Sequence, residues 1–294
     1  AGAGLVGRRG QVAKQAVVAR THQAETARDF LMRHRAPPIL LMPNAWDPMS
    51  ARLFADAGFD ALATTSGGVA WALGYPDGEI APWPEIVAAT ARIVRAARVP
   101  VSADIEAGYG ESVAEVARHV TEIIAAGVVG INLEDGVRGV LRNVDDACAR
   151  LRAAREAARK EGVALVINAR CDTYLRSTDE EAARFEATVG RCKAYLAAGA
   201  DCVYPFGVRD PELIASLVRA IDAPVNITGR AGMPDAAAFE RMGVARITIA
   251  SAGTLVAMST IRTLARELHA TGSFAGLAAD IRHPEAQKLF STPQ

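Results

Sequence analysis

Cysteine, aromatic residues and net charge are all scarce in this sequence of 294 residues. The 4 cysteines, Cys148, Cys171, Cys192 and Cys202, form no C-x-x-C pair, so the sequence predicts buried thiols rather than a zinc cluster. The 33 basic residues balance the 33 acidic ones, which disfavours nucleic acid as a partner. No apolar run approaches the ~18 residues of a membrane-spanning helix, which disfavours a membrane protein. We therefore expect a cytoplasmic protein.

Common nucleotide and metalloprotease motifs are also missing. The sequence has no Gly-x-Gly-x-x-Gly fingerprint in its first strand–helix turn, no Walker sequence and no His-Glu-x-x-His. It has instead a repeated unit that starts after Pro37-Pro38: a short apolar run, a polar turn and an amphipathic stretch rich in alanine and leucine. Eight apolar runs are predicted as strands, at 39–42, 61–64, 99–103, 128–133, 164–167, 202–204, 223–225 and 246–249.

The alternation of these strands with helices predicts the fold. Helices are expected at 48–57, 83–97, 112–126, 144–161, 179–198, 211–220, 235–242 and 252–269. Continuous apolar runs are typical of parallel strands covered on both faces. Eight strand–helix pairs are the content of an α/β fold of the (β/α)₈ or TIM barrel type, which we assign to residues 38–270. A doubly wound sheet is the alternative.

The first 37 residues are set apart by an excess of arginine. Residues 1–10 are rich in glycine and alanine, so we expect a frayed tail over residues 1–20. The apolar spacing predicts a helix over 21–34 that covers one end of the barrel.

Four carboxylates follow two neighbouring predicted strands, Asp104 and Glu106 after the third, Glu134 and Asp135 after the fourth. The active site of a barrel lies at the C-terminal ends of its strands. Four carboxylates in that mouth would repel one another unless a cation lies among them. Oxygen ligands without His or Cys favour Mg²⁺, with Mn²⁺ as the second candidate. The alternative is that two of the four form structural ion pairs.

Other polar residues are expected at the same rim. Ser66-Gly67-Gly68 after the second strand offers backbone N–H groups that can bind a carboxylate or phosphate. Arg170 offers a fork for a carboxylate, or it neutralises the acidic set. Asn44 and Asn226 end the first and seventh strands and are further candidates for substrate binding.

Several motifs together resemble one known superfamily. They are Pro43-Asn44-Ala45-Trp46-Asp47, Thr65-Ser66-Gly67-Gly68, Tyr75-Pro76-Asp77-Gly78, Asp104-Ile105-Glu106-Ala107-Gly108-Tyr109-Gly110, Asn132-Leu133-Glu134-Asp135 and Asn168-Ala169-Arg170-Cys171-Asp172. In this order, at predicted strand ends, they resemble the isocitrate lyase/phosphoenolpyruvate mutase superfamily over residues 38–270. The combination of Asp-x-Glu-x-Gly-Tyr-Gly with a downstream Glu-Asp is specific, whereas no single motif is.

The resemblance implies a Mg²⁺-dependent enzyme that makes or breaks a C–C or C–P bond of a small 2-oxo or 2-hydroxy acid through an enolate. It implies Asp104, Glu106 and Glu134 as metal residues and Asp77, Arg170 and Glu134 as catalytic residues. Ser66, Gly67, Gly68 and Arg170 would bind the substrate carboxylate. The resemblance also implies a homo-oligomer, a dimer or tetramer that exchanges its last helix, for which the apolar residues of segment 271–294 are suited.

The segment after Glu134-Asp135 departs from the superfamily. Lyases carry a loop there with a proton-donating cysteine, and mutases carry a longer loop, whereas residues 136–143 here lack a thiol and precede a helix closely. Thr64 replaces an aromatic residue. Arg138, Arg142 and Asn143 remain able to cover the mouth and bind a second acidic group. Tyr109, Tyr204 or a metal-bound water are candidates to return the proton.

Three functions are compatible with these residues. The first is a Mg²⁺-dependent C–C lyase, acting by retro-aldol cleavage or decarboxylation on a small 2-oxo or 2-hydroxy dicarboxylic acid; a short lid excludes water poorly and favours such chemistry. The second is a C–P enzyme, a phosphonomutase or phosphonopyruvate hydrolase, with Arg138 and Arg142 as the phosphonate clamp. The third is a barrel that binds a 2-oxo acid without turning it over.

Overall fold

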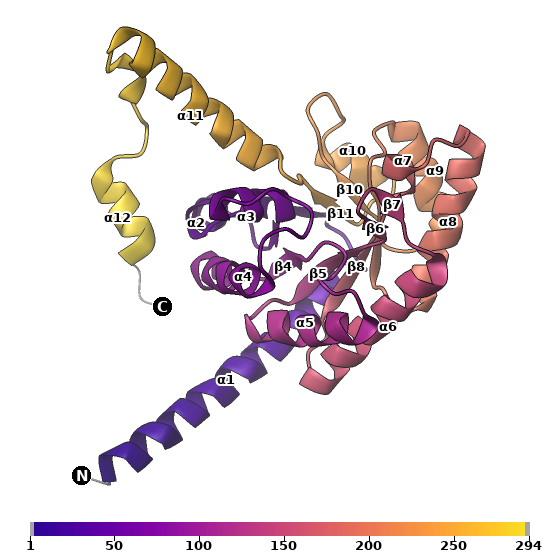
Figure 1. The fold of residues 1–294 in the computed structure, drawn as a ribbon, viewed down its shortest axis with the longest axis horizontal. Helices are drawn as coiled ribbons and strands as arrows, with labels where there is room; N and C mark the ends of the chain where they lie inside the picture. Colours follow the sequence, from indigo (N-terminus) through magenta and orange to yellow (C-terminus); the bar gives the residue numbers. More distant parts are fainter. Residues whose placement is uncertain (1–2, 292–294) are drawn as a thin grey trace.

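Parallel strands form a closed barrel in the computed structural model, which describes the backbone of residues 3–291 and the side chains of residues 18–291 (Figure 1). The barrel strands are β1 (Leu40–Met42), β2 (Asn44–Ala45), β3 (Leu62–Thr64), β4 (Val101–Asp104), β5 (Gly130–Glu134), β8 (Val166–Cys171), β9 (Cys202–Pro205), β10 (Asn226–Thr228) and β11 (Arg246–Thr248). Their pairings run in the orders β1-β11-β10 and β2-β3-β4-β5-β8-β9.

The two sheets join into one barrel at two places. Pro43 separates β1 from β2 because it has no N–H to donate. Its carbonyl still accepts from Ala63 N at 3.0 Å, so β1 and β2 form one continuous strand of the barrel. On the other side, Val203 pairs in parallel with Val225 just before β10. With β1 and β2 counted as one, the described strands form the eight-stranded parallel barrel that the sequence predicts.

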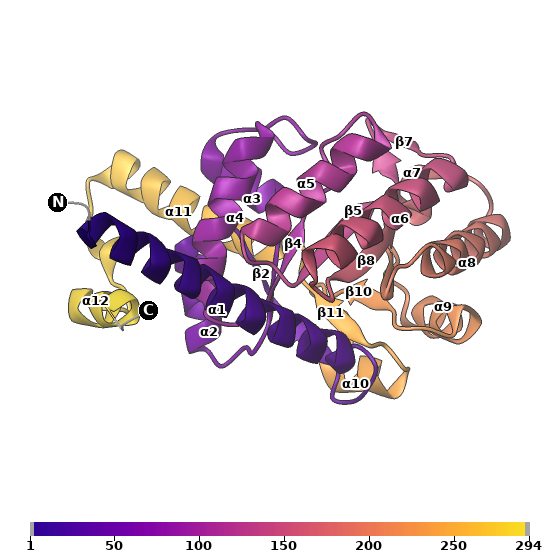
Figure 2. The same ribbon diagram turned by 90° about the horizontal axis from the view of Figure 1, so that it is seen from below.

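Helices cover the outside of the barrel (Figure 2). They are α2 (Pro48–Asp56), α4 (Trp83–Ala97), α5 (Val113–Ala125), α6 (Val144–Glu161), α8 (Glu181–Ala197), α9 (Pro211–Ile221) and α10 (Ala236–Arg241). Local chemistry explains where two of them begin: Asp47 and Ser112 each accept a backbone N–H within a capping box at the starts of α2 and α5. These helices match the predicted ranges within two residues at each end.

Two local predictions are wrong, and two short helices and a hairpin were not predicted. Helix α1 (Ala3–Arg33) includes residues 3–20, which were expected as a frayed tail; residues 1 and 2 lie outside the described part. The seventh strand was placed at 223–225 and lies at Asn226–Thr228. Ser66–Leu73 and Thr173–Arg176 form short helices, α3 and α7, that were not predicted. Residues 136–143, for which no secondary structure was predicted, include a hairpin of β6 (Gly136–Val137) and β7 (Val140–Leu141).

Helix α1 closes the N-terminal end of the barrel, as predicted. Ala27 and Phe30 are 0 % exposed, and Phe30 lies against Gly130 at the start of β5. His34 Nδ1 donates to Phe30 O at 2.8 Å, and burial, followed by the charge of Arg246, lowers the pKa of His34 to about 3. His34 is therefore neutral at physiological pH, as a buried imidazole beside an arginine should be.

The inside of the barrel is polar over much of its length. Asn132, Asn168, Asn226 and Arg246 are buried, and Asn168 Nδ2 donates to Asn132 Oδ1 at 2.7 Å. Arg246 is 0 % exposed, and burial lowers the pKa of its guanidinium. This polar layer explains why the seventh strand was predicted too early in the chain. The prediction followed the apolar run at 223–225, which stops where the inward-facing residues of the strand become polar.

The C-terminal segment projects away from the barrel. Helix α11 (Ala252–Thr271) extends outward, and α12 (His283–Ser291) lies beside α2, where Arg52 Nε donates to Leu289 O at 2.7 Å (Figures 1 and 2). A short 3₁₀ turn at Ala275–Leu277 separates them. Large apolar side chains on α11 and after it are exposed: Leu255, Val256, Met258, Ile261, Leu268, Phe274, Leu277, Ile281 and Phe290.

Within the part of the chain that the structure describes, no helix is both long enough and apolar enough to span a bilayer.

The closure by α1 predicts a large stability effect of Phe30. Phe30→Ala should lower the free energy of unfolding by about 3–5 kcal/mol, because the ring is fully buried and its removal leaves a cavity. Met32→Ala on the same helix is the control, since Met32 is 61 % exposed and its loss should cost no more than about 0.5 kcal/mol. Urea denaturation measures both values. Equal effects of the two substitutions would show that α1 does not seal the barrel.

Candidate active site

A cavity of about 760 Å³ lies at the C-terminal ends of the strands, where the active site is expected. Predicted site residues that line it are Asn44, Ser66, Asp77, Asp104, Glu106, Glu134, Arg138 and Arg170. Gly67, Gly68, Asn226 and Arg142 are not among its lining residues within the described part of the chain. The structure thus brings most of the candidates to one mouth and leaves four of them out of its lining.

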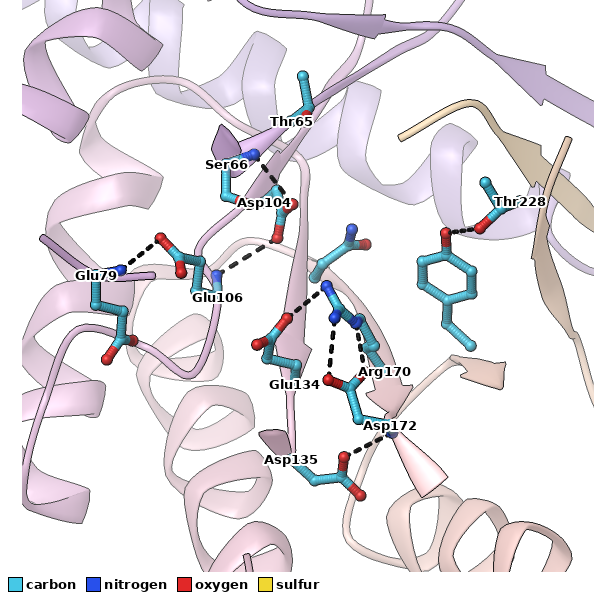
Figure 3. Close-up of polar contacts among 12 residues, drawn as sticks. Thr65, Ser66, Glu79, Asp104, Glu106, Glu134, Asp135, Arg170, Asp172 and Thr228 are labelled. Carbon is cyan, nitrogen blue, oxygen red and sulfur yellow. Dashed lines mark hydrogen bonds and ion pairs between the residues drawn. The ribbon is translucent and has the colours of Figure 1, made fainter. Parts of the chain in front are cut away.

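Three carboxylates lie at neighbouring strand ends (Figure 3). Asp104 ends β4 and Glu134 ends β5, and the pairing of these strands sets Asp104 level with Asn132, two residues before Glu134. Glu106 follows Asp104 by two residues, and its N–H points to Asp104 Oδ1 at 3.4 Å. Asp104 and Glu134 reach the mouth because the backbone alternates inward and outward along a strand, whereas Glu106 reaches it from the loop that follows β4.

Burial raises the pKa of all three carboxyl groups. The pKa of Glu106 rises to about 7, and the nearby charges of Asp77 and Asp104 contribute to this shift. The pKa values of Asp104 and Glu134 also rise, first because of burial, although Arg170 opposes the rise in both. Carboxylates held in this way would gain from a nearby cation in addition to Arg170.

Asp135, the fourth expected carboxylate, does not join the mouth. It is 1 % exposed and accepts hydrogen bonds from Tyr195 OH at 2.5 Å and Arg191 Nη1 at 3.0 Å. Its other oxygen accepts from Asp172 N at 2.8 Å. The reason is strand alternation: if Glu134 faces inward, Asp135 must face the surrounding helices. The expectation that all four carboxylates gather at the rim was therefore wrong for Asp135.

Arg170 is held in place from three sides. Its Nη1 lies 2.6 Å from Glu134 Oε2, and its Nε and Nη2 lie 2.6 and 3.0 Å from the two oxygens of Asp172 (Figure 3). The guanidinium also stacks on Phe206, 3.9 Å from the ring centroid. Burial alone would lower the pKa of Arg170, but Glu134 and Asp172 raise it above its ordinary value. Arg170 therefore neutralises part of the acidic set and still faces the cavity.

The Ser66-Gly67-Gly68 segment is the first turn of α3, with Thr65 as its N-cap residue. Ser66 N donates to Asp104 Oδ2 at 3.1 Å, so this N–H already serves an anion. A Cβ on Gly68 would lie 2.6 Å from Thr254 Oγ1 and 2.8 Å from Trp46 Cβ. Gly68 is thus required by close packing, while Ser66 is the member of this segment that lines the mouth.

Glu79 is a site residue that the sequence analysis missed. Its N–H donates to Glu106 Oε1 at 3.0 Å, and its carboxylate accepts from Tyr109 N at 2.6 Å. Tyr109 OH donates to Glu106 Oε1 at 2.7 Å, and burial raises the pKa of Glu79. Its place directly after Tyr75-Pro76-Asp77-Gly78 was the available signal, since a polar turn next to a candidate residue reaches the same mouth.

The two predicted asparagines hold the barrel together. Asn44 Nδ2 donates to Thr64 O at 2.7 Å, and its Oδ1 accepts from Ile249 N at 2.7 Å, so its amide links neighbouring strands of the barrel at the cavity edge. Asn226 is 0 % exposed and donates to Thr248 Oγ1 at 3.3 Å. Tyr204, which lines the cavity, bonds through its hydroxyl to Thr228 Oγ1.

The β6–β7 hairpin separates its two arginines. Arg138 at the tip lines the cavity and pairs with Glu111. Arg142 lies at the base, where its Nη1 is 2.9 Å from Asp146 Oδ2. Asn143 accepts from Asp145 N at 2.8 Å and caps α6. The hairpin thus presents one cation to the mouth in this conformation.

The donor set is compatible with Mg²⁺. Among the residues that the structure describes, no three Asp, Glu, His or Cys side chains converge into a preformed metal cage. Mg²⁺ does not need one, because it commonly binds through one or two carboxylates and keeps several waters. Asp104 could serve as one such carboxylate, and Glu106 or Glu134 beside it as a second. These ligands are all oxygen atoms, without nitrogen or sulfur.

Known proteins resemble the chain over most of its length. A family described as phosphoenolpyruvate phosphomutase matches residues 30–269. An uncharacterized protein of Mycobacterium tuberculosis is 35 % identical over 221 residues, 75 % of this chain and 80 % of that protein. An oxaloacetate decarboxylase of Chromohalobacter salexigens is 30 % identical over 257 residues, 83 % of this chain and 86 % of that enzyme.

Solved structures show the same fold. A candidate phosphonomutase from Burkholderia cenocepacia superposes with a TM-score of 0.79 and 43 % identity, over 82 % of this chain and 99 % of the other. A 2,3-dimethylmalate lyase and an oxaloacetate acetylhydrolase bound to oxalate each give a TM-score of 0.79 and 26 % identity, covering 92 % and 91 % of this chain and 94 % and 93 % of theirs. The chain therefore belongs to the phosphoenolpyruvate phosphomutase family, within the isocitrate lyase/phosphoenolpyruvate mutase superfamily.

Proposed function

We propose that this protein is a Mg²⁺-dependent lyase that cleaves a C–C bond of a small 2-oxo or 2-hydroxy dicarboxylic acid, by decarboxylation or retro-aldol cleavage. The observation that carries the proposal is the set of three carboxylates, buried or partly buried and with raised pKa values, next to the immobilised Arg170. Relatives named as an oxaloacetate decarboxylase, an oxaloacetate acetylhydrolase and a 2,3-dimethylmalate lyase support the reaction class.

Each group at the mouth has a distinct task in such a cleavage. Mg²⁺, held by Asp104 with Glu106 and Glu134, would stabilise the negative charge that develops on the substrate oxygen. Arg170 lines the cavity while Glu134 and Asp172 fix its plane, so it can help to orient a substrate carboxylate without rearranging. Ser66 N–H, at the start of α3, donates to Asp104 Oδ2 and so holds this carboxylate at the mouth. In decarboxylation, CO₂ leaves and the C–C bonding electrons pass into the enolate. In retro-aldol cleavage, a carboxylate of the mouth also takes the hydroxyl proton of the substrate, whose C–O bond becomes the carbonyl of the released 2-oxo acid. In both cases the enolate then takes up a proton.

Phosphonate chemistry is the second candidate. It is favoured by the 43 % identity to the candidate phosphonomutase and by Arg138 at the cavity edge. Against it, Arg142 pairs with Asp146 away from the cavity, so the two-arginine clamp expected from the sequence is not assembled in this conformation. The C–C reaction needs one cation at the distal end of the substrate and is compatible with this arrangement.

Turnover of a panel of acids tests the proposed function. With Mg²⁺, oxaloacetate, 2-methylmalate or 2,3-dimethylmalate should release a 2-oxo acid, CO₂ or a carboxylate, and EDTA should stop the reaction. Asp104→Asn should lower kcat/KM at least ~100-fold, because it removes the carboxylate closest to the Ser66 N–H and the proposed metal. Glu212→Gln, an exposed change on α9, is the control. Turnover of phosphonopyruvate alone would establish the C–P reaction instead.

Metal binding should weaken as pH falls. Glu106 has a pKa of about 7 in the metal-free protein, above its ordinary value, so it carries a proton at pH 6 and has largely lost it at pH 8. A metal must displace that proton, so calorimetry should show weaker Mn²⁺ binding, with more proton release, at pH 6 than at pH 8. Glu106→Gln should flatten the dependence. Equal affinity at the two pH values in the wild type would contradict the account.

We also propose that the protein is a homo-oligomer in which the exposed apolar side chains of α11 pack on a second copy. Val256 is 68 % exposed and Ile261 66 %, on a helix that projects from its own barrel. The Val256→Asp/Ile261→Asp double variant should elute as a monomer by size exclusion with light scattering, whereas Arg219→Asp on α9 should not change the mass. A monomeric wild type would refute the proposal.

A further inference from the structure

The loop that carries Glu106 has an unusual backbone. Glu106 and Tyr109 adopt positive φ angles of 50° and 55°, and Gly108 between them has a φ of 99°. Glycine adopts such angles freely, but residues with a side chain do so only where surrounding structure enforces them. Something outside the loop must therefore hold residues 106–111 in this shape.

Two buried side chains supply that restraint. Arg150 on α6 is 4 % exposed, and it donates from Nη1 to Gly110 O at 2.8 Å and from Nη2 to Glu111 O at 2.7 Å. His119 on α5 is 5 % exposed, and its Nδ1 donates to Gly108 O at 2.9 Å. Three carbonyls of one loop are thus held by side chains from the two helices that follow β4 and β5.

Arg150 also connects the loop to the β6–β7 hairpin. Its Nε lies 3.3 Å from Asp146 Oδ1, and the same carboxylate accepts from Arg142 at the base of the hairpin. At the hairpin tip, Arg138 pairs with Glu111 of the loop. The hairpin is therefore joined to the loop at both its base and its tip.

We propose that Arg150 is a positioning residue for the active site, which acts by fixing the 106–111 backbone so that Glu106 and Tyr109 meet at the mouth. Arg150 is not among the residues that line the cavity, so its influence passes through Gly110 and Glu111. The inference deepens the proposed function, because Glu106 matters through the metal site assigned to it there.

Arginine is the residue type that this task requires. Its planar fork donates in two directions at once, which matches two consecutive carbonyls while Nε faces a carboxylate. Lysine has one compact ammonium group on a flexible stem and cannot span the same three acceptors with fixed geometry. Arg150→Lys should therefore restore only part of the function that Arg150→Met removes.

Helix α6 provides a matched control. Arg155 donates to Leu165 O at 2.8 Å and Gly199 O at 2.8 Å and pairs with Asp201, so it too joins a helix to backbone carbonyls. None of these partners belongs to the 106–111 loop. Arg155→Met and Arg150→Met should lower Tm by comparable amounts, which separates loss of stability from loss of positioning.

Two measurements on the full chain test the proposal. Hydrogen exchange of the metal-free protein follows the amides of Gly108 and Tyr109, which donate to Ile105 O at 2.8 Å and Glu79 Oε1 at 2.6 Å. Calorimetry follows binding of Mn²⁺. Arg150→Met should speed exchange at these amides at least tenfold and weaken Mn²⁺ binding at least tenfold, Arg150→Lys should lie between, and Arg155→Met should stay within twofold of wild type in both.

Wild-type exchange and Mn²⁺ binding in Arg150→Met would overturn the inference, as would equal changes in Arg155→Met. If Arg150→Met does not fold, Arg150→Lys decides by the same two criteria. If the wild type binds no Mn²⁺, the metal site of the proposed function fails, and the exchange data still decide whether Arg150 holds the loop.

Discussion

Negative charge confined to the mouth of the barrel is the constraint on which the arrangement of the site depends. Asp104, Glu106 and Glu134 lie on two adjacent strand ends, and burial raises the pKa of each. Arg170 compensates only part of this charge, because its fork is shared between Glu134 and Asp172. A barrel that keeps three carboxylates in this state loses stability at that end, and the divalent cation that we propose there would restore it.

The surrounding structure is organised to hold this set in place. Strand alternation turns Glu134 toward the mouth and Asp135 outward, where Arg191 and Tyr195 neutralise and satisfy it. The backbone N–H of Asp172 then bonds to Asp135, which links the outward carboxylate to the residue that orients Arg170. A single strand end therefore supplies both a site residue and its support. Around the site, positive φ angles occur at Glu79, Glu106 and Tyr109, all of which lie in loops.

Much of this could be predicted from the sequence. Apolar runs alternating with amphipathic stretches indicated the eight barrel strands and the main helices. The rule that a barrel's active site lies at the C-terminal ends of its strands placed Asp104, Glu106, Glu134 and Arg170 at one mouth. The errors have identifiable physical causes. A polar barrel interior shortens the apolar runs, so Asn226–Thr228 was missed as a strand, and Ser66-Gly67-Gly68 looks like a turn because glycine conceals the start of α3.

Other features depend on contacts between segments far apart in the sequence. Nothing local to Glu79 shows that its N–H will meet Glu106, and nothing in the hairpin shows that Arg142 will pair with Asp146 rather than face the mouth. Predicting that the Asp135 side chain faces outward requires the last residue of β5 to be known exactly. The hydrophobic periodicity of the sequence does not define a strand end to one residue. The exposed apolar side chains of α11 could be recognised only once the helix was seen to leave the barrel.

The central claim is that the strand-end carboxylates bind a divalent cation. Crystals grown with Mn²⁺ and oxalate, measured at the manganese absorption edge, test this most directly. The account predicts one strong anomalous peak at the mouth, in contact with Asp104 and between Glu106 and Glu134, with oxalate beside Arg170. A peak bound elsewhere, or none at Mn²⁺ concentrations that support full turnover, would contradict it.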